Sequence, residues 1–196
     1  MYSKERAKQV VKKDIKYIPA GIHENVALSN ARLGVSPTGR NFIEIVFEKE
    51  GATLTHTEWE PKRNSMDTDE TFQTKEDNQF SRILQILTCF YNDENLVFNA
   101  TTFKEWANEV VRYLINADKS ILVRIKVVYN DRGYTTLPQY AAYTFIEPMS
   151  VTDSKIVELG IDRFTRPVAA DKEEVVDPIN MTVDKEENSI GNDLPF

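Results

Sequence analysis

Alternating hydrophobic and polar positions predict two β-strands near the start of the chain. The run NFIEIVFE, residues 41–48, alternates over its whole length, so its large apolar side chains share one face: Ile43, Ile45 and Phe47. The run VALSNARL, within residues 22–33, predicts a strand with a bulge, because its alternation slips near Ser29 and Asn30. The turn sequence Ser-Pro-Thr-Gly, residues 36–39, joins the two strands into a hairpin.

Three further β segments follow. Gly51 marks a turn, and TLTHTEW, residues 53–59, has a β-rich composition, so the first three strands are predicted to form a meander. The runs ILVRIKVVY, residues 121–129, and YAAYTFI, residues 140–146, predict two more strands, with Gly133 in the turn between them.

Helical spacing between these two groups of strands predicts a helical insertion, about residues 74–116. Residues 61–73 are polar and are interpreted as a loop, and Thr74 is the expected start of the first helix. Its apolar positions recur at helical intervals: Phe80, Ile83, Leu84, Leu87 and Tyr91. The second helix starts at a capping box, Thr102 to Glu105, and has its own apolar face: Phe103, Trp106, Ala107, Val110, Val111 and Leu114.

This order of elements predicts a mainly β fold with inserted helices. Three strands, a helical insertion and two more strands is the order of an OB-fold-like five-stranded Greek-key barrel, although one inserted helix is usual. A generic α+β sheet is the alternative. Residues 1–18 are expected to form a basic helical segment, residues 19–166 the barrel domain, whose stretch from 150 adds a short docking helix, and residues 167–196 an acidic flexible tail.

The charge distribution matters more than the net charge of −7. Residues 1–16 hold six basic and two acidic side chains, whereas residues 171–196 hold eight acidic and two basic side chains. The residues between them carry a net charge of −5, so a surface that binds a polyanion must be a local basic groove.

The composition also limits the cellular setting. No apolar run approaches the ~20 residues of a membrane helix, and the first residues lack the apolar stretch of a secretory signal. Cys89 is the only cysteine, so neither an internal disulfide nor a cysteine-rich zinc site is expected. A reducing, cytoplasmic location fits these features best.

Enzymatic motifs are sparse. His23 and His56 are the only histidines, and the sequence has no phosphate-binding glycine loop, nucleophile elbow or Cys-His signature, so we expect no enzyme, no cofactor and no bound metal. One alternative is a metal-dependent nuclease built on the Glu-x-Lys fragment at residues 60–62, with other carboxylates as companions: Glu44, Glu48, Asp67 and Asp69.

The end of the chain resembles the C-terminal tip of bacterial and bacteriophage single-stranded-DNA-binding proteins. Those proteins end in an acidic tail followed by an apolar residue, proline and phenylalanine, and the matching positions here are Asp193, Leu194, Pro195 and Phe196. Asn192 departs from the family's run of aspartates. Residues 21–59 also resemble bacteriophage single-strand-binding proteins with a Gly-Ile-His-Glu start.

The resemblance implies binding of single-stranded DNA without sequence specificity, in replication, recombination or repair, in the host cytoplasm if the protein is viral. It also implies that the four C-terminal residues recruit partner proteins. A free carboxylate beside a phenylalanine ring suits a partner pocket that combines a basic residue with an apolar slot.

Sequence-tolerant binding of single strands requires cations for the phosphates and aromatic rings for the bases. Basic and aromatic residues alternate in the predicted strands and turns, and the expected DNA-binding residues are Arg32, Arg40, Phe42, Trp59, Lys62, Arg63, Arg124, Lys126, Arg132, Tyr134, Tyr140 and Tyr143. A protein–protein interaction module without DNA binding is the rival interpretation, and homo-oligomerisation stays open.

Overall fold

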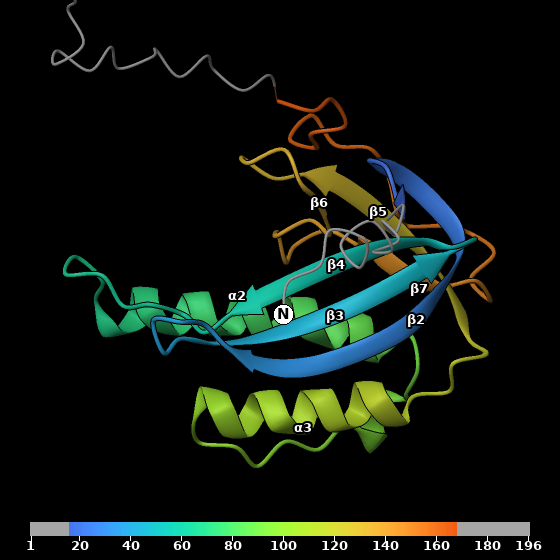
Figure 1. The fold of residues 1–196 in the computed structure, drawn as a ribbon. Coiled ribbons are helices and arrows are strands. Elements are labelled where there is room, and N and C mark those ends of the chain that lie inside the picture. Colours follow the sequence, from blue (N-terminus) through green and yellow to red (C-terminus); the bar gives the residue numbers. More distant parts are fainter. Residues whose placement is uncertain (1–15, 168–196) are drawn as a thin grey trace, which may run out of the picture.

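The computed structural model describes residues 16–167 and shows a mostly β protein with a nearly closed, barrel-like sheet and two helices (Figure 1). Residues 1–15 of the predicted basic helical segment, and residues 168–196 of the predicted acidic tail with its tip, lie outside the described residues. The described end of the first segment, Lys16–Tyr17, is a strand and not helical. The elements are β1 (Lys16–Tyr17), β2 (Gly21–Val35), β3 (Asn41–Lys49), β4 (Ala52–Trp59), α2 (Asp69–Leu87), η1 (Asp93–Asn95), α3 (Phe103–Asn116), β5 (Leu122–Tyr129), β6 (Thr135–Thr136) and β7 (Ile146–Pro148).

The predicted meander of β2, β3 and β4 is confirmed, and β5 returns to pair with β2. The sheet runs in the order β1-β4-β3-β2-β5-β6, with β7 also paired to β5, and only the β1–β4 pair is parallel. β6 approaches β4 across the gap, where His56 Nδ1 lies 3.0 Å from Thr136 Oγ1. This contact between the two ends of the sheet brings it close to a barrel.

Local backbone features shape the strands as the pattern predicts. The register of β2 against β3 shifts between Leu28 and Asn30, which confirms the bulge. Glu50 and Gly51 both have positive φ, 50° and 79°, so they form a two-residue turn whose twist matches the flanking strands. A second irregularity, between His23 and Val26, bends β2 where it pairs with β5.

One core joins the sheet to both helices. The predicted inward face of β3 is fully buried, as are Val123, Ile125 and Val127 of β5. α3 lies along β2 and β3 and buries Ala107, Val110 and Leu114 (Figure 1). Within residues 16–167, no helix is both long and apolar enough to cross a membrane.

The predicted start of the first helix is wrong, whereas that of the second is confirmed. α2 begins at Asp69, because the Thr68 side chain accepts a hydrogen bond from the Thr71 amide and Asp69 and Glu70 suit the positive end of the helix. The expected start, Thr74, lies inside α2 and donates to the Glu70 carbonyl. α3 begins with the capping box of Thr102 and Glu105.

The C-terminal part of the described chain also differs from expectation. The predicted strand of residues 140–146 is wrong except at Ile146, where β7 begins. Gln85 of α2 binds the backbone at Ala141, Tyr143 and Phe145 and holds residues 140–145 out of the sheet. The predicted helix after residue 150 is absent from the described chain. That segment docks as irregular structure and buries Ile156.

Candidate nucleic-acid interface

An aromatic pair occupies the outer face of the sheet at one end of β3 and β4. Phe42 pairs with Trp59 in the β3–β4 register and with Gly34 in the β2–β3 register, so these three residues form one row across three strands. The two ring centroids are 4.7 Å apart, with an interplanar angle of 46°. Trp59 is 39% exposed, so this ring can be reached by a ligand.

Two arginines frame the pair. Arg32 Cζ lies 5.7 Å from the Phe42 ring centroid, and Arg40 Cζ lies 5.4 Å from that of Trp59. Arg32 donates two hydrogen bonds to Glu44, of 2.6 and 2.9 Å, which compensates its charge. Arg40 donates its Nε to the Glu60 carbonyl at 2.7 Å and keeps its charge uncompensated by any carboxylate within residues 16–167. We call these four residues, Arg32, Arg40, Phe42 and Trp59, the aromatic platform.

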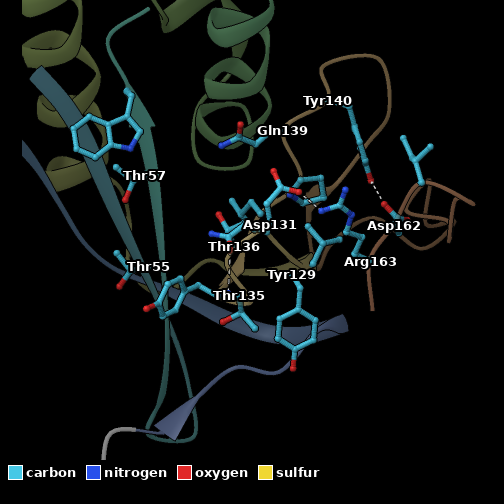
Figure 2. A pocket seen from close by; sticks show the side chains of 17 residues that line it. Thr55, Thr57, Tyr129, Asp131, Thr135, Thr136, Gln139, Tyr140, Asp162 and Arg163 are labelled. Carbon is cyan, nitrogen blue, oxygen red and sulfur yellow. Dashed lines mark hydrogen bonds and ion pairs between the residues drawn. The ribbon is translucent and has the colours of Figure 1, made fainter. Parts of the chain in front are cut away.

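A hollow of about 560 Å³ continues from Trp59 along the outer face of β4. Its floor carries Thr57 and Thr55, which alternate with the buried residues of the strand. The opposite wall comes from β6 and from the turn between β5 and β6, as Figure 2 shows, with Thr135 facing the floor. The lining of this hollow combines polar and apolar side chains in similar proportion.

The acidic residues in this hollow are compensated. Asp131 is ion-paired with Arg163, and the buried Asp162 with Lys126. By contrast, several cations around the platform and hollow form no ion pair within the described residues: Arg40, Lys62, Arg132 and Arg166. The local charge is therefore more positive than the average over the chain.

Lys126 does not project from an open face, and that part of the sequence-based expectation is wrong. Its side chain is fully buried, donates to Asp162 at 2.7 Å and to the Tyr140 hydroxyl at 2.8 Å, and also binds the Val157 carbonyl. The segment around residues 157–162 covers this face of β5. Tyr140 therefore belongs to this buried network and also lines the hollow. Burial, together with Asp162, raises the pKa of Tyr140.

The Arg124 side chain also forms contacts within the protein instead of projecting freely into solvent. It forms ion pairs with Glu24 of β2 and Glu147 of β7, and its side chain is 13% exposed. Burial alone would raise the pKa of Glu147, but hydrogen bonds from Ser154, the Lys155 amide and Arg124 hold it below its ordinary value. Arg124 and Lys126 therefore stabilise β5 instead of forming a positive track.

Some of the other expected DNA-binding residues line the hollows, and the rest lie outside them. Lys62 lines a smaller hollow with Arg40 and Trp59, and Tyr134 lines the main hollow. Arg132 is exposed at the tip of the turn after β5. Arg63 turns towards α2, pairing with Asp69 and lying 5.0 Å above the Phe72 ring, whereas Tyr143 packs edge-on against Tyr140.

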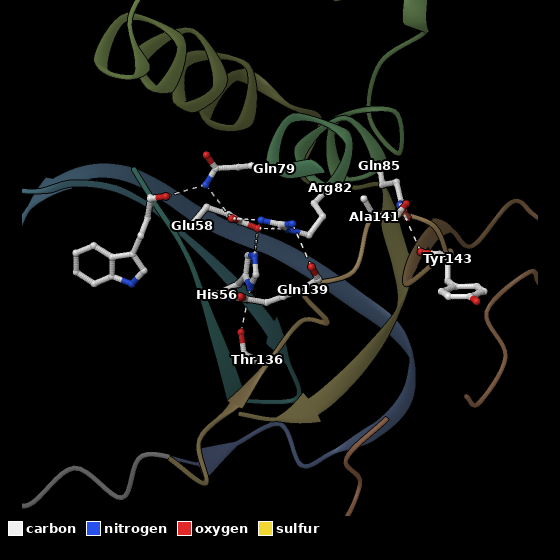
Figure 3. Close-up of polar contacts among 10 residues, drawn as sticks. His56, Glu58, Gln79, Arg82, Gln85, Thr136, Gln139, Ala141 and Tyr143 are labelled. Carbon is white, nitrogen blue, oxygen red and sulfur yellow. Dashed lines mark hydrogen bonds and ion pairs between the residues drawn. The ribbon is translucent and has the colours of Figure 1, made fainter. Parts of the chain in front are cut away.

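A buried polar network fixes the end of β4 beneath the platform (Figure 3). Glu58 accepts two hydrogen bonds from Arg82, of 2.7 and 2.8 Å, and one from Gln79 at 2.9 Å, while His56 Nε2 lies 3.1 Å away. Gln79 also donates to the Trp59 carbonyl at 2.9 Å. α2 thus holds the backbone that carries the platform's tryptophan.

The charge state of Glu58 follows from these contacts. Burial alone would raise its pKa, but the hydrogen bonds from Arg82 and His56 and their charges hold it well below the usual range. Glu58 is therefore ionised at neutral pH, and its buried charge is compensated by Arg82.

Four of the five carboxylates of the nuclease hypothesis are occupied by other contacts, among them Asp69 by Arg63, whereas Glu48 is exposed. Glu60 accepts hydrogen bonds from the backbone and side-chain amides of Asn41, Glu44 binds Arg32, and Asp67 binds Lys75. Within residues 16–167, no three His, Cys, Asp or Glu side chains are grouped to hold a metal ion.

Sequence reasoning missed part of this site. Thr55 and Thr57 lie on the same face of the strand as Trp59, because side chains alternate along TLTHTEW. This alternation is enough to predict the floor of the hollow from the sequence. Arg163, which also lines the hollow, carries no such signal, because it joins the site only through the folding of an irregular segment.

Comparisons with known proteins do not identify a family. No protein-family model matches the chain, and a search of curated proteins finds no match.

Proposed function

We propose that this protein binds single-stranded DNA without sequence specificity. The observation that carries the proposal is the aromatic platform, in which the two rings of β3 and β4 lie beside Arg32 of β2 and Arg40 of the adjoining turn. Base–aromatic stacking contributes about 1–3 kcal/mol per base and tolerates any sequence, because every base has a π-face. Arg40, which forms no ion pair within residues 16–167, supplies charge for a phosphate beside the stacked bases.

The strand order supports assigning the sheet to an OB-like five-stranded Greek-key barrel. β2, β3 and β4 correspond to the first three strands of that fold, β5 to the fourth, and β6 with β7 to a broken fifth strand. OB folds bind oligonucleotides on the face of their second and third strands and on two adjoining loops. In this protein that face is β3 and β4, and the loops are residues 36–40 and 130–134, which is where the platform and the hollow lie.

The test is a titration of the full chain with a labelled oligothymidine. Phe42→Ala and Trp59→Ala should each weaken binding roughly 5- to 150-fold, the range that corresponds to one lost stacking contact. Tyr143→Ala removes an exposed ring that lies outside the aromatic platform and the hollow, and should leave the affinity unchanged. Absence of any association at low salt would overturn the proposal and favour a protein–protein interaction module.

Salt dependence separates the two interpretations further. Affinity for a single strand should fall with salt, with a slope of about −0.7 in log–log form for each phosphate contact. Arg40→Ala should therefore make the slope shallower by about 0.7, because Arg40 has no carboxylate partner within the described part of the chain. A slope unaffected by this change would remove Arg40 from the phosphate track.

We also propose that the C-terminal tip recruits replication, recombination or repair proteins. This rests on the resemblance of residues 193–196 to the tip of single-stranded-DNA-binding proteins. Deletion of residues 194–196 should preserve oligothymidine affinity and abolish recovery of such proteins from a host extract. Equal recovery by the full-length and truncated chains would show that the tip has no recruiting role.

A further inference from the structure

A second hollow, of about 630 Å³, lies beyond the first one, at the other end of the outer face of β4. It shares several lining residues with the first hollow, namely Thr55, Tyr129, Tyr134 and Thr135, so the two form one continuous path. Thr55 is four residues from Trp59 along β4, which corresponds to about 13 Å at ~3.3 Å per residue. The second hollow is therefore separated from the aromatic platform by more than one nucleotide's width.

The second hollow has the same kinds of side chain as the aromatic platform. Two of its tyrosines are among the most exposed large hydrophobic side chains of the described chain, Tyr17 at 65% and Tyr134 at 66%. Among the described residues that line it, Arg166 is the only charged one, and it forms no ion pair within residues 16–167. Rings and an uncompensated cation thus occur together again.

The residues of this hollow are held in place. Tyr17 belongs to β1 and is anchored by the next residue, Ile18, which is buried and donates its amide to the Thr53 carbonyl at 3.0 Å. On the opposite wall, Asn130 Oδ1 accepts hydrogen bonds from the amides of Arg132 and Tyr134, both of 3.0 Å. These contacts fix the turn that presents Tyr134.

Gly133 explains how Arg166 joins the site. Its φ is +75°, and a side chain on it would place Cβ 3.2 Å from Arg166 Nε. The absence of a side chain lets the Arg166 side chain lie directly against the turn. The guanidinium is therefore brought next to Tyr134 from a segment more than thirty residues away.

We propose that this hollow is a second nucleotide-binding station, in which Tyr17 and Tyr134 stack bases and Arg166 binds a phosphate of the same strand. The proposal rests on the proposed function, because it extends one strand from the aromatic platform along β4. Its ligand is any single-stranded segment long enough to occupy both stations. OB folds bind roughly 4–16 nucleotides, so a path with two stations fits within this range.

The experiment compares two oligothymidines, of about four and about twelve nucleotides, on the full chain. Tyr17→Ala and Arg166→Glu should each weaken binding of the longer oligomer about tenfold and change binding of the shorter one less than twofold. Tyr17→Phe retains the ring and should restore the affinity. Arg112→Glu, the same charge change on exposed α3, should affect both lengths little.

The outcomes separate this inference from the proposed function. If Trp59→Ala weakens binding but Tyr17→Ala and Arg166→Glu leave the longer oligomer unaffected, the second station is refuted and the proposed function stands. Equal losses for both lengths would also refute a separate station. Both variants change exposed residues, and unaltered thermal melting will show that the fold is intact.

Discussion

At the scale of single residues, Gly34 is the position on which the aromatic platform depends most. A Cβ at this position would lie 2.2–2.8 Å from three atoms of the Phe42 ring, so the ring rests directly on the glycine backbone. A residue with a Cβ leaves no room for the ring in this position.

Gly34→Ala should displace the Phe42 ring and weaken oligothymidine binding about as much as Phe42→Ala does. The cost in stability should be about 1–3 kcal/mol, the range for an overpacked contact. Gly160→Ala is the matched control, because its Cβ would meet nothing within 4 Å. Titration and urea unfolding of both variants measure the two effects, and full affinity in Gly34→Ala would show that the ring's orientation is irrelevant.

Lys126, in contrast to Gly34, contributes to the stability of the fold and not to the aromatic platform. Lys126→Met leaves Asp162 buried without its partner and should lower the free energy of unfolding by about 3–5 kcal/mol. The double change Lys126→Met with Asp162→Asn should recover part of this loss, because no unpaired charge remains. The folded variants should bind oligothymidine as the unchanged chain does, and a selective loss of affinity would place Lys126 in the interface after all.

At the scale of elements, the sequence predicts most strongly where a short-range period or cap decides the structure. The alternation in residues 41–48 fixed the inward face of β3, and the capping box at Thr102 fixed the start of α3. The start of α2 was misplaced, because Thr74 and the acids after it imitate a cap within the helix.

The candidate site was predictable to a similar extent. The alternation of β3 and β4 leads to the aromatic platform, since Phe42 and Trp59 lie outside the buried positions. The burial of Lys126 was not predictable, because its partner Asp162 is 36 residues away in a segment without regular structure. A strand face that is covered by an irregular segment distant in the sequence produces no periodic pattern of hydrophobic residues.

The network between α2 and β4 should make stability depend on pH. Because the folded pKa of Glu58 is depressed, its stabilisation is fully present above the pKa of an unfolded glutamate, ~4.3, and is lost as the pH falls towards the folded value. Glu58→Gln should therefore lower the free energy of unfolding by about 1.5–3 kcal/mol at pH 7, and the difference should shrink below about pH 4. Urea unfolding at both pH values measures this, with exposed Glu48→Gln as the control. A difference independent of pH would mean that the charge of Glu58 contributes nothing.

At the scale of the whole molecule, the two described ends of the chain meet at the second station. Tyr17, close to the first described residue, and Arg166, close to the last, line the same hollow. The two segments that adjoin these residues in the sequence therefore have opposite net charges. Residues 1–15 have five basic and two acidic side chains, and residues 168–196 have two basic and eight acidic ones.

This arrangement predicts that the acidic segment competes electrostatically with DNA. The composition of residues 171–196 predicts a flexible coil, and a coil of 26 residues spans about 25–30 Å. Screening lengths grow from ~10 Å at 0.1 M salt to ~30 Å at 0.01 M. Deletion of residues 171–196 should therefore strengthen oligothymidine binding several-fold at low salt and hardly at all at high salt. A chain of full length with these eight acids changed to Asn or Gln should behave like the deletion, since only the charge differs. If the deletion strengthens binding equally at all salt concentrations, the effect comes from steric obstruction instead of charge, because steric exclusion does not depend on screening.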